Sequence, residues 1–456
     1  MTLLAGAWSL DAAGSAPDAA GVSALHAALA RSGDTVESAA VGRLAVAKID
    51  IGALGSPAFV DDGKGHVLLA TGRPLFDAAG RTPHRTRNED LVALRPALAA
   101  DGPAALRRCQ GSYTLCASDG EQLLLATDKL GARPLYFAVA GNTLWFANAI
   151  RLLEAVPAIE LSLDVRGLTE EVLLGFALAD RTAFAPLRVL RGGEALTATS
   201  SRWDRQRYAH WSEAASAPTP ARAELVANYH DTFLDAVACR APADDGVNAF
   251  LSGGLDARVI AASLIAAGRP VRTLTFEFPG RLDGPLARTL AAALGTEHRP
   301  VPADPGVGQL QHKLTAARYL DPAAPQGTAA SIFSGDGGSV GLGYVYMTEA
   351  MVTELRDGRR DAALARHLDG KALPRKVLQR QAFERMQPLL RDGIEAELVA
   401  VNCDDPARAF HTYLMDNDQR RHLYAVFEQL DIGRTEFELP FFDGRLLEMT
   451  AAAPVE

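Results

Sequence analysis

The sequence predicts an α/β protein in which a mainly antiparallel N-terminal region precedes a parallel C-terminal sheet covered by helices. Short apolar runs separated by Gly and Asp fill the N-terminal region, whereas strands and helices alternate regularly after residue 246. The chain has 456 residues, of which 48% are hydrophobic and 22% charged. This length and balance predict a globular protein of two or three domains.

The N-terminal region has the spacing of hairpins. Runs rich in β-branched, aromatic and leucine residues are each closed by a turn residue, and a helix is predicted over 90–100. The predicted strands are 65–71, 111–117, 122–127, 134–139 and 143–147. We therefore expect antiparallel sheets with few helices in this region.

The pattern of predicted elements changes after a stretch rich in Ser, Ala and Pro at 212–220. A helix at 221–241 is followed by the strand 247–251, a glycine turn, the helix 258–267, the strand 271–276 and the helix 285–294. This order is typical of βαβ units and hence of a parallel sheet with right-handed crossovers. Residues 345–435 are predicted to be mainly helical. We therefore expect the chain to consist of an N-terminal domain at 1–211, a linker at 212–222 and a C-terminal domain at 223–456.

The glycine turn has the features of a phosphate site. Leu251 ends a strand and Ser252 adds a hydroxyl donor. Gly253 and Gly254 let the backbone approach phosphates without a Cβ, and Asp256 lies in the first turn of a helix. Unpaired N–H groups and the helix dipole favour an anion there, and the carboxylate could hold Mg²⁺. The alternative is an ordinary strand-to-helix turn. The flanking βαβ pattern favours the phosphate site.

The loop 252–256, Ser-Gly-Gly-Leu-Asp, resembles the pyrophosphate loop of the asparagine synthetase family, which includes β-lactam synthetases and lasso-peptide cyclases. The resemblance extends over almost the whole chain. Further matching stretches lie at 128–136, 146–150, 275–278, 334–339 and 439–443.

This resemblance implies an N-terminal αββα domain like the Ntn hydrolases and a C-terminal ATP-pyrophosphatase domain like the adenine nucleotide α-hydrolases. It implies ATP and Mg²⁺ as cofactors and an enzyme that adenylates a carboxylate, releases pyrophosphate and joins the acyl group to an amine. The second loop would hold the nucleotide through Ser334, Gly335, Gly337 and Gly338, and Phe278 would lie beside the adenine.

The chain departs from the family where glutamine would be hydrolysed. Thr2 replaces the nucleophilic cysteine, and 71–74 reads Thr-Gly-Arg-Pro in place of the Asn-Gly segment that holds glutamine. A terminal threonine could act as a nucleophile, but we expect Thr2 to be an ordinary first-strand residue and the domain to be inactive. A substrate amine would then replace ammonia from glutamine.

The phosphate loops also depart from the family. Ala257 stands where serine is usual, and Ser339 replaces an aspartate that binds Mg²⁺. Asp336 could supply the missing carboxylate or could only brace its own loop. We predict that Asp336 faces the same cleft as Asp256 and that both carboxylates are catalytic and bind Mg²⁺.

A family lysine expected near the C-terminus has no match before Glu456, which leaves Lys371 and Lys376 as the nearest candidates, although both are more simply read as solvated helix residues. The cationic run 420–422 is expected to be a helix surface, with contact to a phosphate or acidic substrate as the alternative.

Three functions stay open. The favoured one is amide-bond formation in natural-product or peptide tailoring, such as macrolactam or β-lactam closure. The others are a non-catalytic nucleotide-binding partner subunit and ammonia-dependent synthesis of an asparagine-type amide.

The net charge of −9 argues against a nucleic-acid partner. No apolar run is long enough for a membrane span, and no signal peptide is recognised, so we expect a cytoplasmic protein. The four cysteines lack metal-binding spacing and are expected to be reduced and mostly buried. A homodimer or a partner protein is left open, and the substrates are expected to be a carboxylate and an amine.

Overall fold

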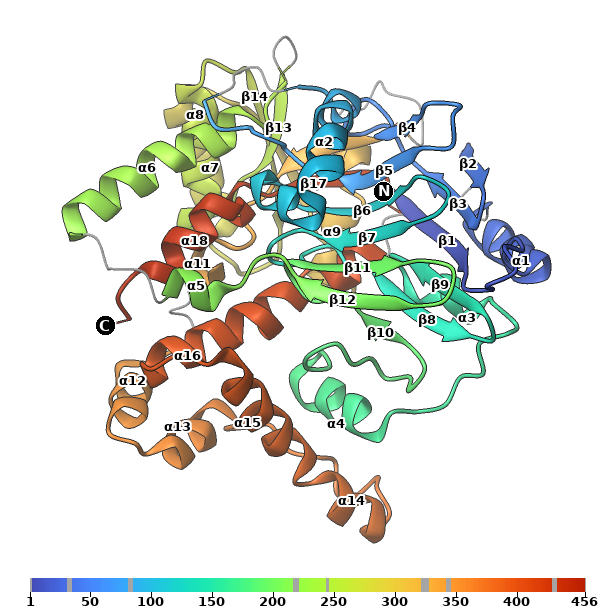
Figure 1. The fold of residues 1–456 in the computed structure, drawn as a ribbon. Coiled ribbons are helices and arrows are strands. Elements are labelled where there is room, and N and C mark those ends of the chain that lie inside the picture. Colours follow the sequence, from blue (N-terminus) through green and yellow to red (C-terminus); the bar gives the residue numbers. More distant parts are fainter. Residues whose placement is uncertain are drawn as a thin grey trace.

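The computed structural model describes residues 2–30, 35–80, 85–215, 221–242, 246–320, 328–341, 346–428 and 433–455. Two antiparallel six-stranded sheets come first in the chain and a parallel five-stranded sheet follows (Figure 1). The division at 211 and 223 stays a prediction, and residues 216–220 of the proposed linker lie outside the described residues.

The first antiparallel sheet has the strand order β10-β8-β9-β1-β3-β2 and the second the order β12-β11-β7-β6-β5-β4. The first sheet comprises β1 (Leu3–Ser9), β2 (Val36–Val41), β3 (Leu44–Ile49), β8 (Tyr136–Ala140), β9 (Thr143–Ala147) and β10 (Arg188–Val189). The second comprises β4 (Phe59–Asp61), β5 (Val67–Gly72), β6 (Tyr113–Ser118), β7 (Leu123–Thr127), β11 (Glu194–Ala198) and β12 (Trp203–Arg207).

Alternation along β1 shows how the two sheets are layered. Leu4 and Trp8 join a core between the two sheets, whereas Leu3 and Ala5 join a core on the opposite face. Successive strand residues point to opposite faces, so a strand that is apolar at every position is buried on both. The expected strands are therefore continuous apolar runs at the centre of a sandwich.

Helices cover the outer faces of this sandwich. The first sheet is covered by α1 (Ala19–Leu29) and α3 (Ile150–Glu154), whose apolar residues share a core with β1, β3, β8 and β9. The second sheet is covered by α2 (Arg87–Asp101) and the 3₁₀ helix η2 (Gly102–Arg108). A capping box of Thr86 and Glu89 begins α2. The expected αββα architecture is confirmed.

The third sheet is parallel throughout, in the order β15-β14-β13-β16-β17. Its strands are β13 (Val247–Phe250), β14 (Val271–Glu277), β15 (Glu297–Pro302), β16 (Ala330–Phe333) and β17 (Thr435–Glu438). Helices α6 (Arg222–Ala238) and α7 (Leu255–Ala266) pack on one face, where Ala249 and Phe333 meet Phe233 and Ile260. Helix α8 (Asp283–Leu294) packs beside α7. The expected parallel α/β sheet is confirmed.

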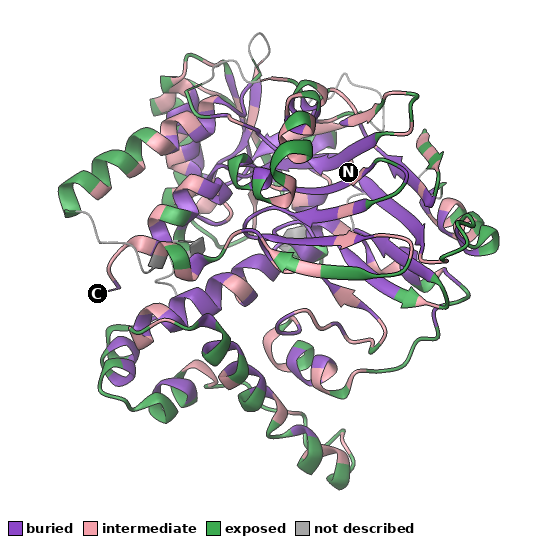
Figure 2. Cartoon of the chain, viewed as in Figure 1, coloured by how far each residue is buried: buried purple, intermediate pink, exposed green. Residues whose placement is uncertain are grey.

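Helices α4, α12, α13, α14, α15 and α16 lie below the sheets in Figure 1. Residues of α12, α13, α15 and α16 share one apolar core with Leu178 of the N-terminal region. Their outward faces are exposed, most visibly on α14 and α15 (Figure 2). The bounds are α4 (Val165–Leu174), α5 (Trp211–Ala215), α9 (Gln309–Leu314), α10 (Ala317–Leu320), α11 (Gly338–Gly341), α12 (Glu349–Arg356), α13 (Arg360–His367), α14 (Arg380–Met386), α15 (Leu389–Val401), α16 (Pro406–Leu414), the π-helical segment η4 (Met415–Gln419), α17 (Tyr424–Glu428), the 3₁₀ helix η5 (Pro440–Phe442) and α18 (Gly444–Ala452).

No helix among the described residues is long and apolar enough to cross a bilayer. Of the four cysteines, Cys109, Cys116 and Cys239 are buried and Cys403 is partly exposed, and all four are free thiols. Lys371 and Lys376 are exposed and lie in the turn region after α13 rather than on a helix.

The prediction that 420–422 forms a helix surface is wrong for its arginines. Arg420 is fully buried and Arg421 is 8% exposed. The Arg421 guanidinium donates to the carbonyl oxygens of Ala179 (3.1 Å) and Arg181 (2.9 Å), and Arg420 also donates to Ala179. The loop that precedes β10 folds over this turn, so these cations bind backbone carbonyls from the N-terminal region.

A buried ion pair joins the N-terminal sandwich to the edge of the parallel sheet. Arg133 Nη2 lies 2.9 Å from Glu436 Oε2 on β17, and both side chains are at most 3% exposed. The Arg133 guanidinium also lies over the Phe427 ring, 4.3 Å from its centroid. Burial alone would raise the pKa of Glu436, but the Arg133 charge holds it below its ordinary value.

Glu436→Ala should lower the free energy of unfolding by about 3–5 kcal/mol, because Arg133 would stay buried without its partner. The double variant Arg133→Met/Glu436→Gln should be more stable than Glu436→Ala, since neither charge remains. Urea unfolding measures both. Glu384→Ala, at an exposed ion pair with Arg380, is the control and should cost under about 1 kcal/mol. A Glu436→Ala protein as stable as this control would contradict the role of the pair.

Candidate nucleotide site

Two glycine loops meet at the carboxyl edge of the parallel sheet. The first, 251–254, follows β13 and leads into α7, and the second, 334–337, follows β16 and leads into α11. Strands β13 and β16 are parallel neighbours, so their carboxyl ends lie at the same edge. Ligands of open α/β sheets bind at this edge.

The contact between these loops leaves no room for a side chain at two glycines. A Cβ on Gly335 would lie 2.9 Å from the nitrogen of Ala257, and a Cβ on Gly338 would lie 2.6 Å from Oδ1 of Asp256. Both positions therefore require glycine. Gly337 has φ +92°, a left-handed conformation that also favours glycine.

Asp256 and Ser339 join the two loops directly. Oδ2 of Asp256 accepts a hydrogen bond from the Ser339 hydroxyl at 2.6 Å and another from its backbone N–H at 3.1 Å. The residue that replaces the usual aspartate of the family therefore binds the carboxylate of the first loop. The other oxygen, Oδ1, accepts no hydrogen bond from the described residues.

Asp336 has different partners. Nζ of Lys313 lies 3.0 Å from its Oδ1 and 2.9 Å from its Oδ2, and Ser334 Oγ donates to Oδ2 at 2.5 Å. Nε2 of His422 lies 3.8 Å away. Burial alone would raise the pKa of Asp336, but His422, Lys313 and Ser334 together hold it well below its ordinary range. This carboxylate is ionised and paired with a cation.

A cavity of about 240 Å³ lies between the loops. It is lined by Leu251, Ser252, Gly254, Asp256, Phe278, Ser334, Gly335 and Asp336 from the predicted set, together with Phe250, Ala257, Leu274, Thr275, Phe276, Arg281, Asp283 and Lys313. Gly253, Gly337 and Gly338 were also predicted but do not line it. The roles assigned to all these residues stay predictions.

The cavity brings basic side chains close to aromatic rings. The two loops border it, and Lys313 and Arg281 supply positive charge. The Phe276 ring packs 5.2 Å from His312 and 5.9 Å from Tyr319 between centroids, and Arg281 lies 5.5 Å from the Phe278 ring. Anionic phosphates suit the loops and the basic side chains, and a planar base suits the rings.

The donor set fits Mg²⁺ only partly. Asp256 presents a carboxylate oxygen without a hydrogen-bond donor, and Mg²⁺ needs few protein ligands because it keeps several waters. Asp336 is already neutralised by Lys313. No cluster of three His, Cys, Asp or Glu residues suited to a metal occurs in the part of the chain that the structure describes. Sharing of the ion by both carboxylates stays a prediction.

Sequence patterns gave no signal for several residues at this site. Lys313 lies on the six-residue helix α9, and only the fold brings it to Asp336. Asp283 accepts from the Gly253 N–H at 3.2 Å, and His422 reaches Asp336 from the segment before α17. Spacing along the chain cannot reveal such contacts, because Lys313 and His422 lie 23 and 86 residues from Asp336.

Thr2 occupies a closed position beside β17, at the edge of the parallel sheet. It is 1% exposed, directly before β1. Its backbone N–H donates to Glu436 Oε1 and its hydroxyl to Asp50 Oδ2, each at 3.1 Å. Asp50 in turn pairs with Arg87 at 2.7 Å. A nucleophile must reach its substrate, and this hydroxyl is enclosed by an ion-pair network.

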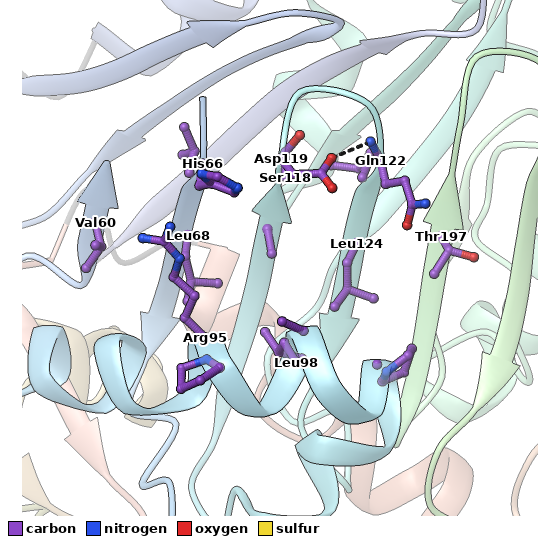
Figure 3. Close-up of a pocket in the computed structure, with 17 residues that line it drawn as sticks. Val60, His66, Leu68, Arg95, Leu98, Ser118, Asp119, Gln122, Leu124 and Thr197 are labelled. Carbon is purple, nitrogen blue, oxygen red and sulfur yellow. Dashed lines mark hydrogen bonds between the residues drawn. The ribbon is translucent and has the colours of Figure 1, made fainter. Parts of the chain in front are cut away.

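A second cavity, of about 490 Å³, lies in the N-terminal sandwich between α2 and the outer face of β5, β6 and β7 (Figure 3). Its lining is mainly apolar. Asp119 accepts from the Gln122 N–H at 2.8 Å, and Arg95 pairs with Asp62 at 2.5 Å. These charged groups have partners within the fold, and the two glycine loops lie elsewhere, at the edge of the parallel sheet.

Comparison with known proteins gives the same order of parts. A glutamine amidotransferase domain model matches residues 79–209 and an asparagine synthase model matches residues 228–308. The resemblance to the asparagine synthetase family is confirmed. The asparagine synthase match includes the first loop with Asp256.

Among curated relatives, asparagine synthetase [glutamine-hydrolyzing] 3 of Bacillus subtilis is 31% identical over 196 residues, which are 39% of this chain and 31% of that protein. The carboxyethyl-arginine beta-lactam-synthase of Streptomyces clavuligerus is 26% identical over 223 residues, 48% of this chain and 41% of that protein. The chain thus spans about a third of the length of the curated relatives that it matches. The match to a solved structure, an allosteric regulatory enzyme of purine biosynthesis, includes 73% of this chain and 74% of that chain. The sequence identity is 12% and the TM-score is 0.32.

Gly338→Ala should weaken Mg·ATP binding at least about tenfold, because the new methyl group would displace the Asp256 carboxylate and part the loops. Isothermal titration calorimetry measures the affinity, and circular dichroism checks the fold. Gly246→Ala is the matched control, since its Cβ would meet only Pro270 at an ordinary 3.4 Å. Equal affinity of the Gly338→Ala and wild-type proteins would show that the loops need not touch.

Proposed function

We propose that this protein is an ATP-dependent ligase that adenylates a carboxylate and joins the acyl group to an amine. The observation that carries this proposal is the contact between the two glycine loops around Asp256, at the edge where a parallel sheet binds its ligands. The asparagine synthase match over 228–308 supports the same reaction class.

The proposed reaction has two steps. A carboxylate oxygen attacks the α-phosphorus of ATP, the bond from that phosphorus to the bridging oxygen breaks, and pyrophosphate leaves. The amine then attacks the acyl carbon, AMP leaves with the oxygen, and the nitrogen loses a proton. Positioning and stabilisation of the leaving charge supply most of such catalysis.

The chain's own groups fit these needs. Backbone N–H groups of the two loops, including those of Leu255 and Gly337, would hold the pyrophosphate, and Lys313 and Arg281 would add positive charge. Mg²⁺, when bound, would neutralise phosphate oxygens, and Asp256 is the residue best suited to hold it. Asp336 would keep Lys313 in the cavity rather than bind the ion alone.

The amine is proposed to come from the substrate rather than from glutamine. Thr2 is enclosed, which supports an inactive N-terminal domain, and one of the matched relatives is named a beta-lactam-synthase. Natural-product or peptide tailoring, such as macrolactam or β-lactam closure, suits this arrangement. Ammonia-dependent formation of a small amide is the alternative. A cytoplasmic location is part of this proposal.

The Lys313–Asp336 pair favours a second candidate, a nucleotide-binding subunit without catalysis. In this pair, Lys313 binds the Asp336 carboxylate, which would otherwise complete a two-aspartate metal site. ATP–pyrophosphate exchange on a panel of amino acids and short peptides separates the two functions. A ligase exchanges label in the presence of its acid, whereas a non-catalytic subunit binds ATP without exchange.

Asp256→Ala should reduce Mg²⁺-dependent ATP affinity at least about tenfold, because the side chain faces the phosphate cavity. The fold should persist, since Asp256 is partly exposed. Calorimetry with and without Mg²⁺ measures the effect, and exchange should also be lost. Asp231→Ala, on the exposed face of α6, is the control. Unchanged affinity and exchange in Asp256→Ala would refute the site.

The protein should release no glutamate from glutamine, because the Thr2 hydroxyl is buried and bonded to Asp50. A coupled glutamate dehydrogenase assay measures this directly. Glutaminase activity that disappears in Thr2→Ala would show that Thr2 is a working nucleophile. Activity that persists in this variant would point to a contaminant.

A further inference from the structure

A long groove runs between the N-terminal sandwich and the C-terminal helices. One cavity of about 620 Å³ is bounded by α3, the end of α4 and α17, and a second of about 230 Å³ is bounded by α12, α13 and α16. Four residues line both cavities: Leu174, Phe176, Tyr346 and Asp418. The two cavities are therefore continuous parts of one groove, which we call the interdomain groove.

The interdomain groove reaches the nucleotide cavity through His422. This residue lines the groove, and its Nε2 lies 3.8 Å from Oδ1 of Asp336, which lines the nucleotide cavity. The Asp336–His422 contact therefore lies between the two cavities. A molecule in the groove that touches His422 lies next to the residue that binds Asp336.

Asp418 lies in the middle of the groove because of a local break in helix geometry. It belongs to the π-helical segment η4, a geometry that often marks functional sites. Its neighbours point elsewhere: Asp416 pairs with Arg207 at 2.9 Å, and the Asn417 side chain bonds Ala179 and Glu397. The extra residue of the π turn directs Asp418 into the groove.

Asp418 has no ion-pair partner among the described residues. Its Oδ1 accepts only from Gln419 Nε2, at 2.7 Å. Burial raises its pKa above the ordinary value, and the charges of His422 and Lys371 only partly oppose this shift. A half-buried carboxylate in a cavity gains most from a cation that enters from solution.

Two other charged groups of the 620 Å³ cavity, Glu428 and Arg421, are already engaged. Glu428 accepts from the Tyr136 hydroxyl at 2.6 Å and from the Ile150 N–H at 3.3 Å. Arg421 is turned to the carbonyls of Ala179 and Arg181. Glu171 is exposed at the rim and adds a second negative charge.

We propose that the interdomain groove binds an elongated substrate that carries a primary amine, and that Asp418 holds this group as an ammonium ion. Leu174 and Phe176 cover its apolar body, and its other end lies toward Asp336 and His422. This inference rests on the proposed ligase function and makes the second substrate a molecule larger than ammonia. The ammonium group at Asp418 anchors this substrate, and the reacting group is at its other end. Asp418 is a specificity-determining residue rather than a catalytic one.

Binding of a simple probe tests the proposal without ATP. The probe is hexylammonium, with 1-hexanol as its uncharged counterpart, and ligand-observed NMR titration measures both affinities. Wild-type protein should prefer hexylammonium. Asp418→Asn should weaken hexylammonium binding about tenfold or more, as expected when a charged hydrogen bond is lost, and leave hexanol unchanged. Asp204→Asn, on exposed β12, should bind as wild type.

A second variant tests the groove itself, without changing the Asp418 carboxylate. Leu174→Trp fills the groove and leaves Asp418 in place, so both probes should bind more weakly. Equal affinity of wild type for the two probes, or unchanged hexylammonium binding in Asp418→Asn or Leu174→Trp, would overturn the proposal. ATP–pyrophosphate exchange is measured separately, so loss of exchange refutes the ligase function alone.

Discussion

The close contact of two glycine loops is the constraint on which the candidate nucleotide site depends. Because β13 and β16 are parallel neighbours, the chain leaves both strands at one edge of the sheet. The loops approach so closely that a methyl group at Gly335 or Gly338 would collide with the backbone or carboxylate of the first loop. Asp256 and Ser339 then close the contact with two hydrogen bonds, which orient the carboxylate before any ligand arrives. Such preorganisation lowers the cost of binding a charged ligand.

The same sheet carries the link to the N-terminal sandwich. Its edge strand β17 presents Glu436 to Arg133 and to the Thr2 backbone, two contacts from distant parts of the N-terminal region. In a buried environment each group depends on the other, since an unpaired charge there is far more costly than a surface one. Thr2 stands at the position of the expected glutaminase nucleophile. Here its contacts belong to a network that links the N-terminal sandwich to β17. Structural and catalytic use of Thr2 compete, because an enclosed hydroxyl cannot reach a substrate.

Asp336 connects three parts of the molecule. It holds Lys313 in the nucleotide cavity, bonds Ser334 in its own loop and lies beside His422 at the end of the interdomain groove. This position suits a ligase, in which the nucleotide and the second substrate must meet at one carbon atom. It also accounts for the depressed pKa, since two basic side chains surround one carboxylate. The groove reaches this point from the side of the helices, and the nucleotide cavity reaches it from the edge of the sheet.

The sequence alone determined the class of fold and the order of its parts. Continuous apolar runs indicated buried antiparallel strands, and the regular alternation after β13 indicated a parallel sheet, because both patterns are local. The glycines and Asp256 marked the first loop for the same reason. Only the tertiary structure decided that Arg420 and Arg421 are buried, that Lys313 pairs with Asp336, and that Ser339 binds Asp256. Each of these contacts joins residues from separate elements, so it depends on how the elements pack. Charge and spacing along the chain therefore cannot predict it.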